Sequence, residues 1–302
     1  GLDNYVNYWE GLAEEDGVLT YSNKIFEQTG RLRSLEVIES LINYPLGNNH
    51  STCVGGLDHI QVQADFVLGT GGVFMPVGDW VENEMNSYES DQVIGFMKTP
   101  VISSITEVCD SVNEEEELAF VVQCIDEKKD FSQTSALFET EFSGRLTETD
   151  FNKISDARNM FYVNEGHAAY IPSYATAKEV AKDFLRFLAT DVSLELYAET
   201  GFLSPYQYNV QDKQLEVYEG YTQMAKDRNE YYQTAVLMPP RSSFRLCYYG
   251  GLSELPRNAA LDVKFAYSDP ADRKSAQQIY DDDRLYYDKG RFDTLLMQAG
   301  LI

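Results

Sequence analysis

Residues 71 to 85, GGVFMPVGDWVENEM, place a carboxylate beside one of the chain's two tryptophans, as Asp79 and Trp80. The indole of Trp80 has a large apolar face and few rotatable bonds, so it could stack against a flat ligand. The carboxylate of Asp79 could accept hydrogen bonds at the ligand's edge, and charge-assisted hydrogen bonds are the stronger kind. Two structural interpretations stay open, a core position for Trp80 and a helix-capping role for Asp79.

The residues that usually carry catalysis or bind metals form no recognisable motif. The three histidines, His50, His59 and His167, have no metal-ligand spacing. The chain has no GxSxG, no P-loop and no HExxH motif. The acidic run at residues 281 to 283 lacks the spacing of a calcium loop, so we expect a solvated helix face there. With 49 acidic residues, no carboxylate pair stands out. We therefore expect no catalytic residue, metal or cofactor.

The four cysteines, Cys53, Cys109, Cys124 and Cys247, form no CxxC pair and no zinc spacing. We expect free, mostly buried thiols. A disulfide between Cys109 and Cys124 is the alternative.

Composition excludes several classes of partner. The formal net charge of -25 over 302 residues gives no basic surface for nucleic acid or for an anionic membrane. No apolar stretch reaches the roughly 18 residues of a membrane span. The N-terminus has neither the basic start nor the apolar core of a signal peptide. The length fits one large or two ordinary domains. The tyrosines, 21 in number, suit recognition of polar or ring-shaped ligands, or packing.

Apolar spacing and capping pairs outline a helix-rich chain. They predict helices over residues 31–43, 57–68 and 111–128, and helices that begin near residues 147, 176 and 269. The predicted capping pairs are Ser111 with Glu114, Thr147 with Asp150, and Thr176 with Glu179. The apolar face predicted after residue 176 consists of Val180, Phe184, Phe187 and Leu188. Short strands are expected at residues 73–75 and 168–171, and strand or extended chain at residues 93–97 and 100–105, which together with the helices indicate α/β layers.

Two stretches carry a family resemblance. FVLGTGGVFMPVGDWVENEM, from residue 66, resembles a signature of the extracellular solute-binding proteins of carbohydrate ABC transporters. IPSYATAKEVAKDFLRFLATDVSLELYAETGFLSP, from residue 171, resembles a second signature of that family in the expected order and spacing. The segment GTGG departs from the family's usual Gly-Lys-Ala-Ala, and the match loosens after Gly201 apart from AVLMPPRSSFRLCYY.

The resemblance implies a bilobed, helix-rich α/β fold of the periplasmic-binding-protein type II class. Most of the N-terminal lobe, together with the signal peptide and the lipid-anchor cysteine, would be absent from this sequence. Residues 1–160 would then be a segment of the C-terminal lobe with a helical insertion at about 106–158. Residues 161–205 would return to the N-terminal lobe, and residues 206–302 would mostly form C-terminal-lobe helices.

The resemblance also implies a ligand site and a function. Beside Trp80 and Asp79, it suggests as ligand-binding residues Tyr248, Arg245, Tyr5, Tyr8 and Trp9. We expect a non-catalytic, extracytoplasmic protein at the cell surface or in the periplasm, lipid-anchored in its full-length form. It would bind a sugar or oligosaccharide, close over it by a hinge, and deliver it to ABC permease subunits. Without most of the first lobe, we expect this sequence to bind weakly or not at all.

Three alternatives stay open. One is a carbohydrate-active enzyme that uses a carboxylate pair, and another is a binding protein of the same fold for a non-sugar ligand such as a polyamine. The third is a module that binds a protein partner through tyrosines.

Overall fold

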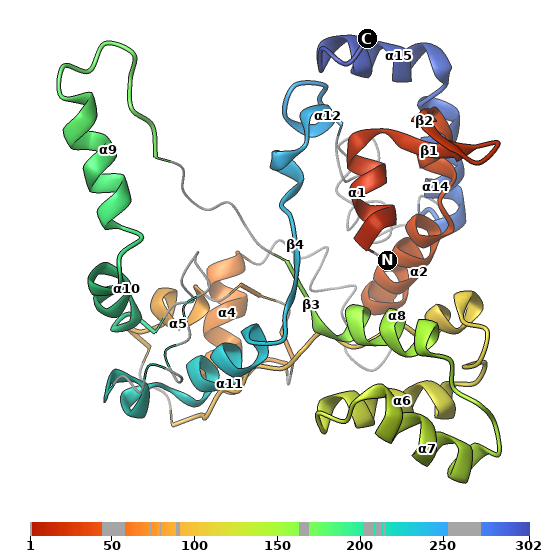
Figure 1. Ribbon diagram of the computed structural model, residues 1–302, viewed down its shortest axis with the longest axis horizontal. Helices are drawn as coiled ribbons and strands as arrows, with labels where there is room; N and C mark the ends of the chain where they lie inside the picture. Colours follow the sequence, from red (N-terminus) through yellow and green to blue (C-terminus); the bar gives the residue numbers. More distant parts are fainter. Residues whose placement is uncertain are drawn as a thin grey trace. The chain divides into compact units, whose positions relative to one another are not determined.

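The computed structural model divides into two compact units, each described by itself below (Figure 1). Unit 1 comprises Gly1–Leu57, Tyr162–Asn164 and Met238–Ile302, and unit 2 comprises Asp58–Phe161 and Glu165–Leu237. Residues 1–57 fall in unit 1, and residues 58–161 fall in unit 2. The structure describes residues 2–43, 58–72, 74–75, 77–78, 80–88, 91–162, 169–201, 208, 210, 213, 216–252 and 273–302.

Unit 1 joins the two ends of the chain. Its elements are α1 (Leu2–Glu10), β1 (Leu12–Glu15), β2 (Val18–Tyr21), η1 (Asn23–Glu27), α2 (Thr29–Asn43), η4 (Arg241–Ser243), α12 (Arg245–Tyr248), α14 (Ala276–Tyr286) and α15 (Lys289–Gln298). β1 and β2 pair antiparallel, with Leu12 opposite Tyr21. Their two-residue turn has positive φ at Asp16 and Gly17, as a type I′ hairpin requires.

The main core of unit 1 is aromatic. Phe26 and Tyr287 stack with ring centroids 4.3 Å apart, and Phe292 meets Phe26 edge-on. Trp9 and Leu246 are buried in the same cluster. A second cluster, built on Leu35, Ala276, Ile279 and Tyr280, joins α2 to α14. The predicted helix over 31–43 is therefore confirmed, and it packs through Leu35 with Leu32 and Ile38, whereas Leu41 is exposed.

Unit 2 contains the middle of the chain. Its elements are α4 (His59–Val67), α5 (Val81–Glu84), η2 (Ser103–Val108), α6 (Glu115–Asp126), α7 (Phe131–Phe142), α8 (Glu148–Asn159), α9 (Lys178–Phe187), α10 (Asp191–Ala198), η3 (Glu216–Gly220) and α11 (Gln223–Tyr232). The strands β3 (Met160–Tyr162) and β4 (Val236–Met238) form a two-stranded sheet. The chain passes from one unit to the other inside both strands, after Phe161 and after Leu237.

Helices α6, α7 and α8 form a bundle with its own core, where a helical insertion was expected. Phe138, Val121 and Ile154 are fully buried in that core. The predicted cap of α6 is wrong by one turn, because the capping box pairs Glu114 with Glu117.

Asp150 explains why Ser111 does not cap α6. The buried carboxylate accepts hydrogen bonds from the Ser111 hydroxyl at 2.7 Å and from the Ser111 N–H at 2.8 Å. The Asp110 N–H and the Lys153 ammonium also donate to it. Burial alone would raise the pKa of Asp150, but these bonds hold it well below its usual range.

The helix-rich character of the chain is confirmed, whereas no strand forms at residues 93–97 or 100–105, where strand or extended chain is expected. Residues 93–97 have no regular structure, and residues 103–105 lie in the 3₁₀ helix η2. The cap predicted at Thr176 is also wrong, because α9 begins after Ala177 without a side-chain cap. The predicted strand over 73–75 and that over 168–171 lie partly outside the described residues, as does the predicted helix start near residue 269. Within the described part of the chain, no helix is long and apolar enough to cross a membrane.

Candidate functional site

Trp80 lies at the surface of unit 2, immediately before α5. Its side chain is 40% exposed, while the next residue, Val81, is buried with Met85 against α4. The indole lies over Gly78, where a Cβ atom would come within 1.8 Å of the ring. Only glycine at this position leaves room for the ring. The Trp80 ring thus lies at the surface, next to the buried side chain of Val81. Asp79 lies outside the described residues.

Glu82 of α5, two residues after Trp80, carries a carboxylate that is held by two partners. Its Oε2 lies 3.6 Å from Nη1 of Arg228, and its Oε1 accepts a hydrogen bond from the Thr222 hydroxyl. Arg228 is almost fully buried and also donates to the carbonyl of Gly201. Sequence reasoning missed Glu82, although its place at the start of the acidic helix after Trp80 was a usable signal. Its partners lie about 140 residues further along the chain, so they could not be predicted.

In unit 1, the predicted residues Tyr8 and Trp9 are core residues. Trp9 is only 3% exposed, and the ring of Tyr8 meets it edge-on at 5.0 Å between centroids. Burial raises the pKa of the Tyr8 hydroxyl well above its usual value. A ligand could not reach either ring in this arrangement, which gives these two residues a packing role.

Tyr5 lies at the edge of the same core. Its hydroxyl donates a 2.9 Å hydrogen bond to the carbonyl of Pro239, and its ring contacts Trp9 and Phe244 edge-on. Burial raises the pKa of Tyr5. This hydrogen bond ties α1 to the segment after β4, so Tyr5 positions α12, which follows.

Helix α12 presents the remaining predicted residues. Its buried residues Phe244 and Leu246 anchor it in the core of unit 1, so that Arg245 and Tyr248 lie exposed. The ring of Tyr248 is 66% exposed and meets that of Tyr249 edge-on, with centroids 4.8 Å apart. Tyr249 was not singled out from the sequence. The two tyrosines form a second aromatic surface, which belongs to unit 1 as Trp80 belongs to unit 2.

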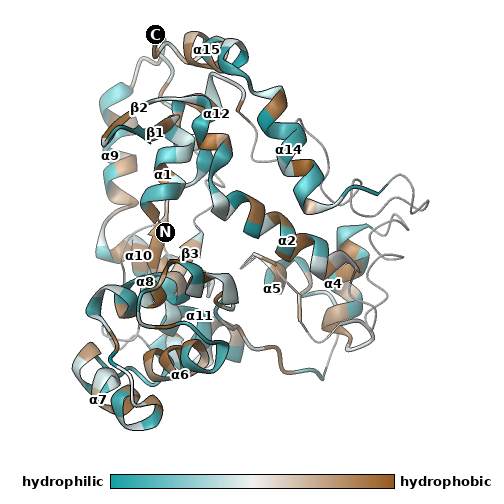
Figure 2. Cartoon of the chain, turned by 90° about the vertical axis from the view of Figure 1, so that its right-hand side faces the viewer, coloured by the Kyte–Doolittle hydropathy of each residue, from teal (hydrophilic) through white to brown (hydrophobic). Residues whose placement is uncertain are grey.

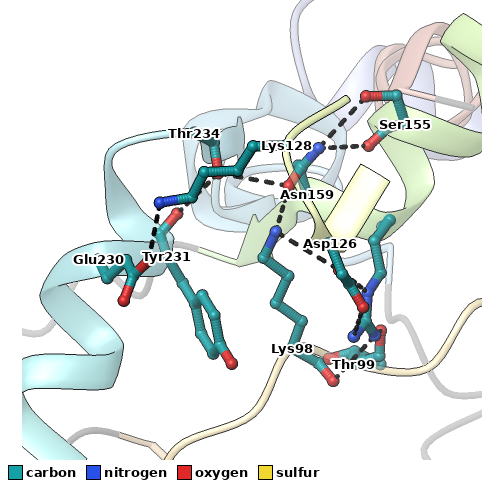
Figure 3. A network of polar contacts seen from close by, with 10 residues as sticks. Lys98, Thr99, Asp126, Lys128, Ser155, Asn159, Glu230, Tyr231 and Thr234 are labelled. Carbon is teal, nitrogen blue, oxygen red and sulfur yellow. Dashed lines mark hydrogen bonds and ion pairs between the residues drawn. The ribbon is translucent and has the colours of Figure 1, made fainter. Parts of the chain in front are cut away.

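A polar network fixes the framework of unit 2 (Figure 3). The Arg158 guanidinium of α8 donates hydrogen bonds to both carboxylate oxygens of Asp126 on α6, at 2.9 and 2.8 Å. It also donates to the carbonyl of Thr99. Lys98 donates to Asn159 at 2.6 Å, and its ammonium lies 5.3 Å from the ring centroid of Tyr231 on α11. Such bidentate pairs are specific in geometry.

Two further contacts extend this network. The Thr234 hydroxyl also donates to Asn159, and Lys128 pairs with Glu230 at 2.8 Å. Burial lowers the pKa of Lys98, and Asp126 opposes that shift. The network joins the α6–α8 bundle to α11 directly beside β3, so its role is to position these elements.

Other candidate chemistry is not assembled. Within the described residues, no group of histidine, cysteine, aspartate or glutamate side chains could hold a metal ion. Cys109, Cys124 and Cys247 are free thiols, and burial raises the pKa of Cys109 to about 11. Cys53, His50 and His167 lie outside the described residues.

Comparisons with known proteins found no relative, so the evidence for function is the geometry described above. No family model matches the chain, and neither the curated proteins nor the solved structures yielded a match.

Proposed function

We propose that this protein binds a sugar or oligosaccharide and delivers it to the permease of an ABC transporter, without catalysing a reaction on it. The observation that carries the proposal is the Trp80 ring, held at the surface of unit 2 over Gly78. Sugars present flat C–H faces and a rim of hydroxyls, so their sites combine an aromatic plate with polar groups at its edge.

The described carboxylate nearest to Trp80 along the chain, Glu82, favours a polar, uncharged ligand. The Glu82 carboxylate is held by Arg228 and Thr222, so its charge is balanced by a buried guanidinium. A carboxylate balanced in this way attracts a free cation weakly but still accepts hydrogen bonds from hydroxyls. This pairing favours a sugar over a polyamine.

The finer expectations form part of the same proposal. A type II bilobed fold would close over its ligand through a hinge, and the protein would act outside the cytoplasm. Two observations support a hinge: the chain has two compact units, and two of the four points where it passes between them lie within the paired strands β3 and β4. The exposed rings of Tyr248 and Tyr249 give unit 1 a plate of its own.

Titration of the 302-residue chain with a panel of oligosaccharides tests the proposal. Isothermal calorimetry should find at least one ligand, and Trp80→Ala should weaken its binding at least tenfold, or about 1.4 kcal/mol. Tyr174→Ala, which removes a ring elsewhere in unit 2 that is 85% exposed against 40% for Trp80, should leave the dissociation constant unchanged. An unaffected Trp80→Ala variant would remove Trp80 from the site.

The same panel separates the alternatives. Spermidine as the only ligand bound would favour the polyamine interpretation, and product release from natural glycans would favour an enzyme. The titration extends to roughly 10 mM ligand, so that even a dissociation constant of about 1 mM would be detected. If no member of the panel bound up to that concentration, the proposal would fail.

A further inference from the structure

Helix α9 exposes an apolar face that other helices of this protein bury. Its apolar residues recur at the spacing of one helix face, yet no residue of α9 is buried. Val180 is 70% exposed and Phe184 is 59% exposed, and Phe187 and Leu188 continue the same face. Figure 2 shows apolar and polar segments alternating along this helix.

The contrast with α6 shows that this exposure is unusual within the chain. Helix α6 has a similar length and buries Leu118, Val121, Cys124 and Ile125 in the core of the bundle. Among the described residues, α9 contributes to none of the buried clusters. A contiguous exposed apolar patch of this kind marks an interaction surface.

Further exposed apolar side chains flank α9 along the chain. They are Tyr170, Tyr174, Val192, Leu196 and Tyr197. Because one aromatic side chain covers roughly 150–250 Å² when buried, this set can supply on the order of the 800 Å² per partner that a standard interface needs. An interface that includes these flanking side chains together with α9 would therefore reach the size of a stable dimer interface.

Charge selects the partner. Helix α9 carries three basic and two acidic side chains, in a chain whose net charge is -25. Glu179 pairs with Lys182, and Asp183 pairs with Arg186, within the helix itself. Two copies of an acidic chain repel over most of their surfaces, but this locally balanced helix lets them approach. An anionic membrane or nucleic acid would meet the repulsion of the whole chain instead.

We propose that the apolar face of α9, formed by Val180, Phe184, Phe187 and Leu188, packs against the same face of a second copy of this chain. A face that lacks excess charge of either sign is complementary to itself, as a twofold symmetric interface requires. This inference concerns a surface distinct from that of Trp80 and does not depend on the ligand proposed above.

Sedimentation velocity of the 302-residue chain, from low micromolar to about 200 μM, a range that brackets micromolar association, tests the proposal. We expect the mass to double with concentration, and Phe184→Glu to raise the dimer dissociation constant at least tenfold. Leu285→Glu is the matched control, because Leu285 is an exposed leucine on α14 of unit 1, and it should dimerise like the wild type. Circular dichroism confirms that both variants fold.

A second measurement locates the interface. Hydrogen–deuterium exchange of α9 should slow as the dimer forms, while exchange in the β1–β2 hairpin stays unchanged. A chain that remains monomeric at the highest concentration would overturn the proposal, whether or not it binds anionic vesicles or another protein through this face. Equal dimerisation by Phe184→Glu and Leu285→Glu would overturn it as well.

Discussion

The buried ion pair between Arg31 and Asp283 gives a sharp test of how unit 1 is held together. Nη2 of Arg31 lies 2.5 Å from Oδ2 of Asp283, whose side chain is 1% exposed. The guanidinium carbon also lies 4.9 Å from the ring centroid of Tyr8 and 5.2 Å from that of Phe26. Asp283→Asn removes the charge that balances a guanidinium enclosed by two rings. Because breaking a buried pair leaves an uncompensated charge, we expect a loss of about 3 kcal/mol of unfolding free energy.

The run of three aspartates supplies the control. Asp282→Asn changes the same residue type one position earlier, where the side chain is 39% exposed and pairs with Lys274. Surface pairs contribute little, so this variant should lose less than about 1 kcal/mol. Urea unfolding followed by Trp9 fluorescence, in a Trp80→Phe background, reports on the core of unit 1. Equal losses in the two variants would refute the assignment of Asp283 as a structural anchor.

Two further substitutions test unit 2. Asp150→Asn should lose about 2 kcal/mol at pH 7 relative to Asp156→Asn, an exposed change on the same helix, because charged hydrogen bonds are strong. The pKa of Asp150 is lower in the folded protein than its value near 4 in the unfolded chain. Its charge therefore stabilises the fold above about pH 4, and this stabilisation is lost as the pH falls further. The denaturation curves of the wild type and of Asp150→Asn should then converge in acid. Gly78→Val should displace the Trp80 ring and change its quenching by acrylamide, whereas Gly220→Val, where a Cβ meets nothing within 4 Å, should not.

Local patterns predicted most helices because a helix face needs only neighbouring residues. The spacing over residues 31–43 and 57–68 corresponds to α2 and α4, and Gly69, which follows α4, has the positive φ typical of a helix stop. The cap of α6 was misplaced for a non-local reason. Ser111 is a good capping residue, but it binds Asp150, which lies 39 positions further along the chain. Single-sequence patterns do not contain such contacts.

The acidic run at residues 281–283 was misjudged for a local reason. Its composition indicated a solvated face, and Asp281 and Asp282 are indeed about half exposed. Asp283, however, lies three and four residues after Tyr280 and Ile279, on the face of α14 that packs against α2. Helical spacing thus contained the signal for a buried aspartate, but the identity of Arg31 as its partner, 252 positions away, was not available from it.

The two tryptophans show why residue type alone does not define a site. Tyr5, Tyr8 and Trp9 follow the spacing of one helix face, so α1 can bury them only together, against the core that Phe26 and Leu246 complete. Trp80 does not share a buried helix face with other aromatic residues in this way. Its neighbours Val81 and Met85 take the buried side of α5, and Gly78 leaves the ring room at the surface.

A buried aromatic ring stabilises the fold through the apolar area that it removes from water. The exposed ring of Trp80 forgoes much of that gain, and the absence of a side chain at Gly78 leaves room for it at the surface. An accessible plate with few rotatable bonds is what a ligand requires, because little conformational entropy is then lost on binding. Trp80, and not Trp9, is therefore the tryptophan on which the proposed sugar site depends.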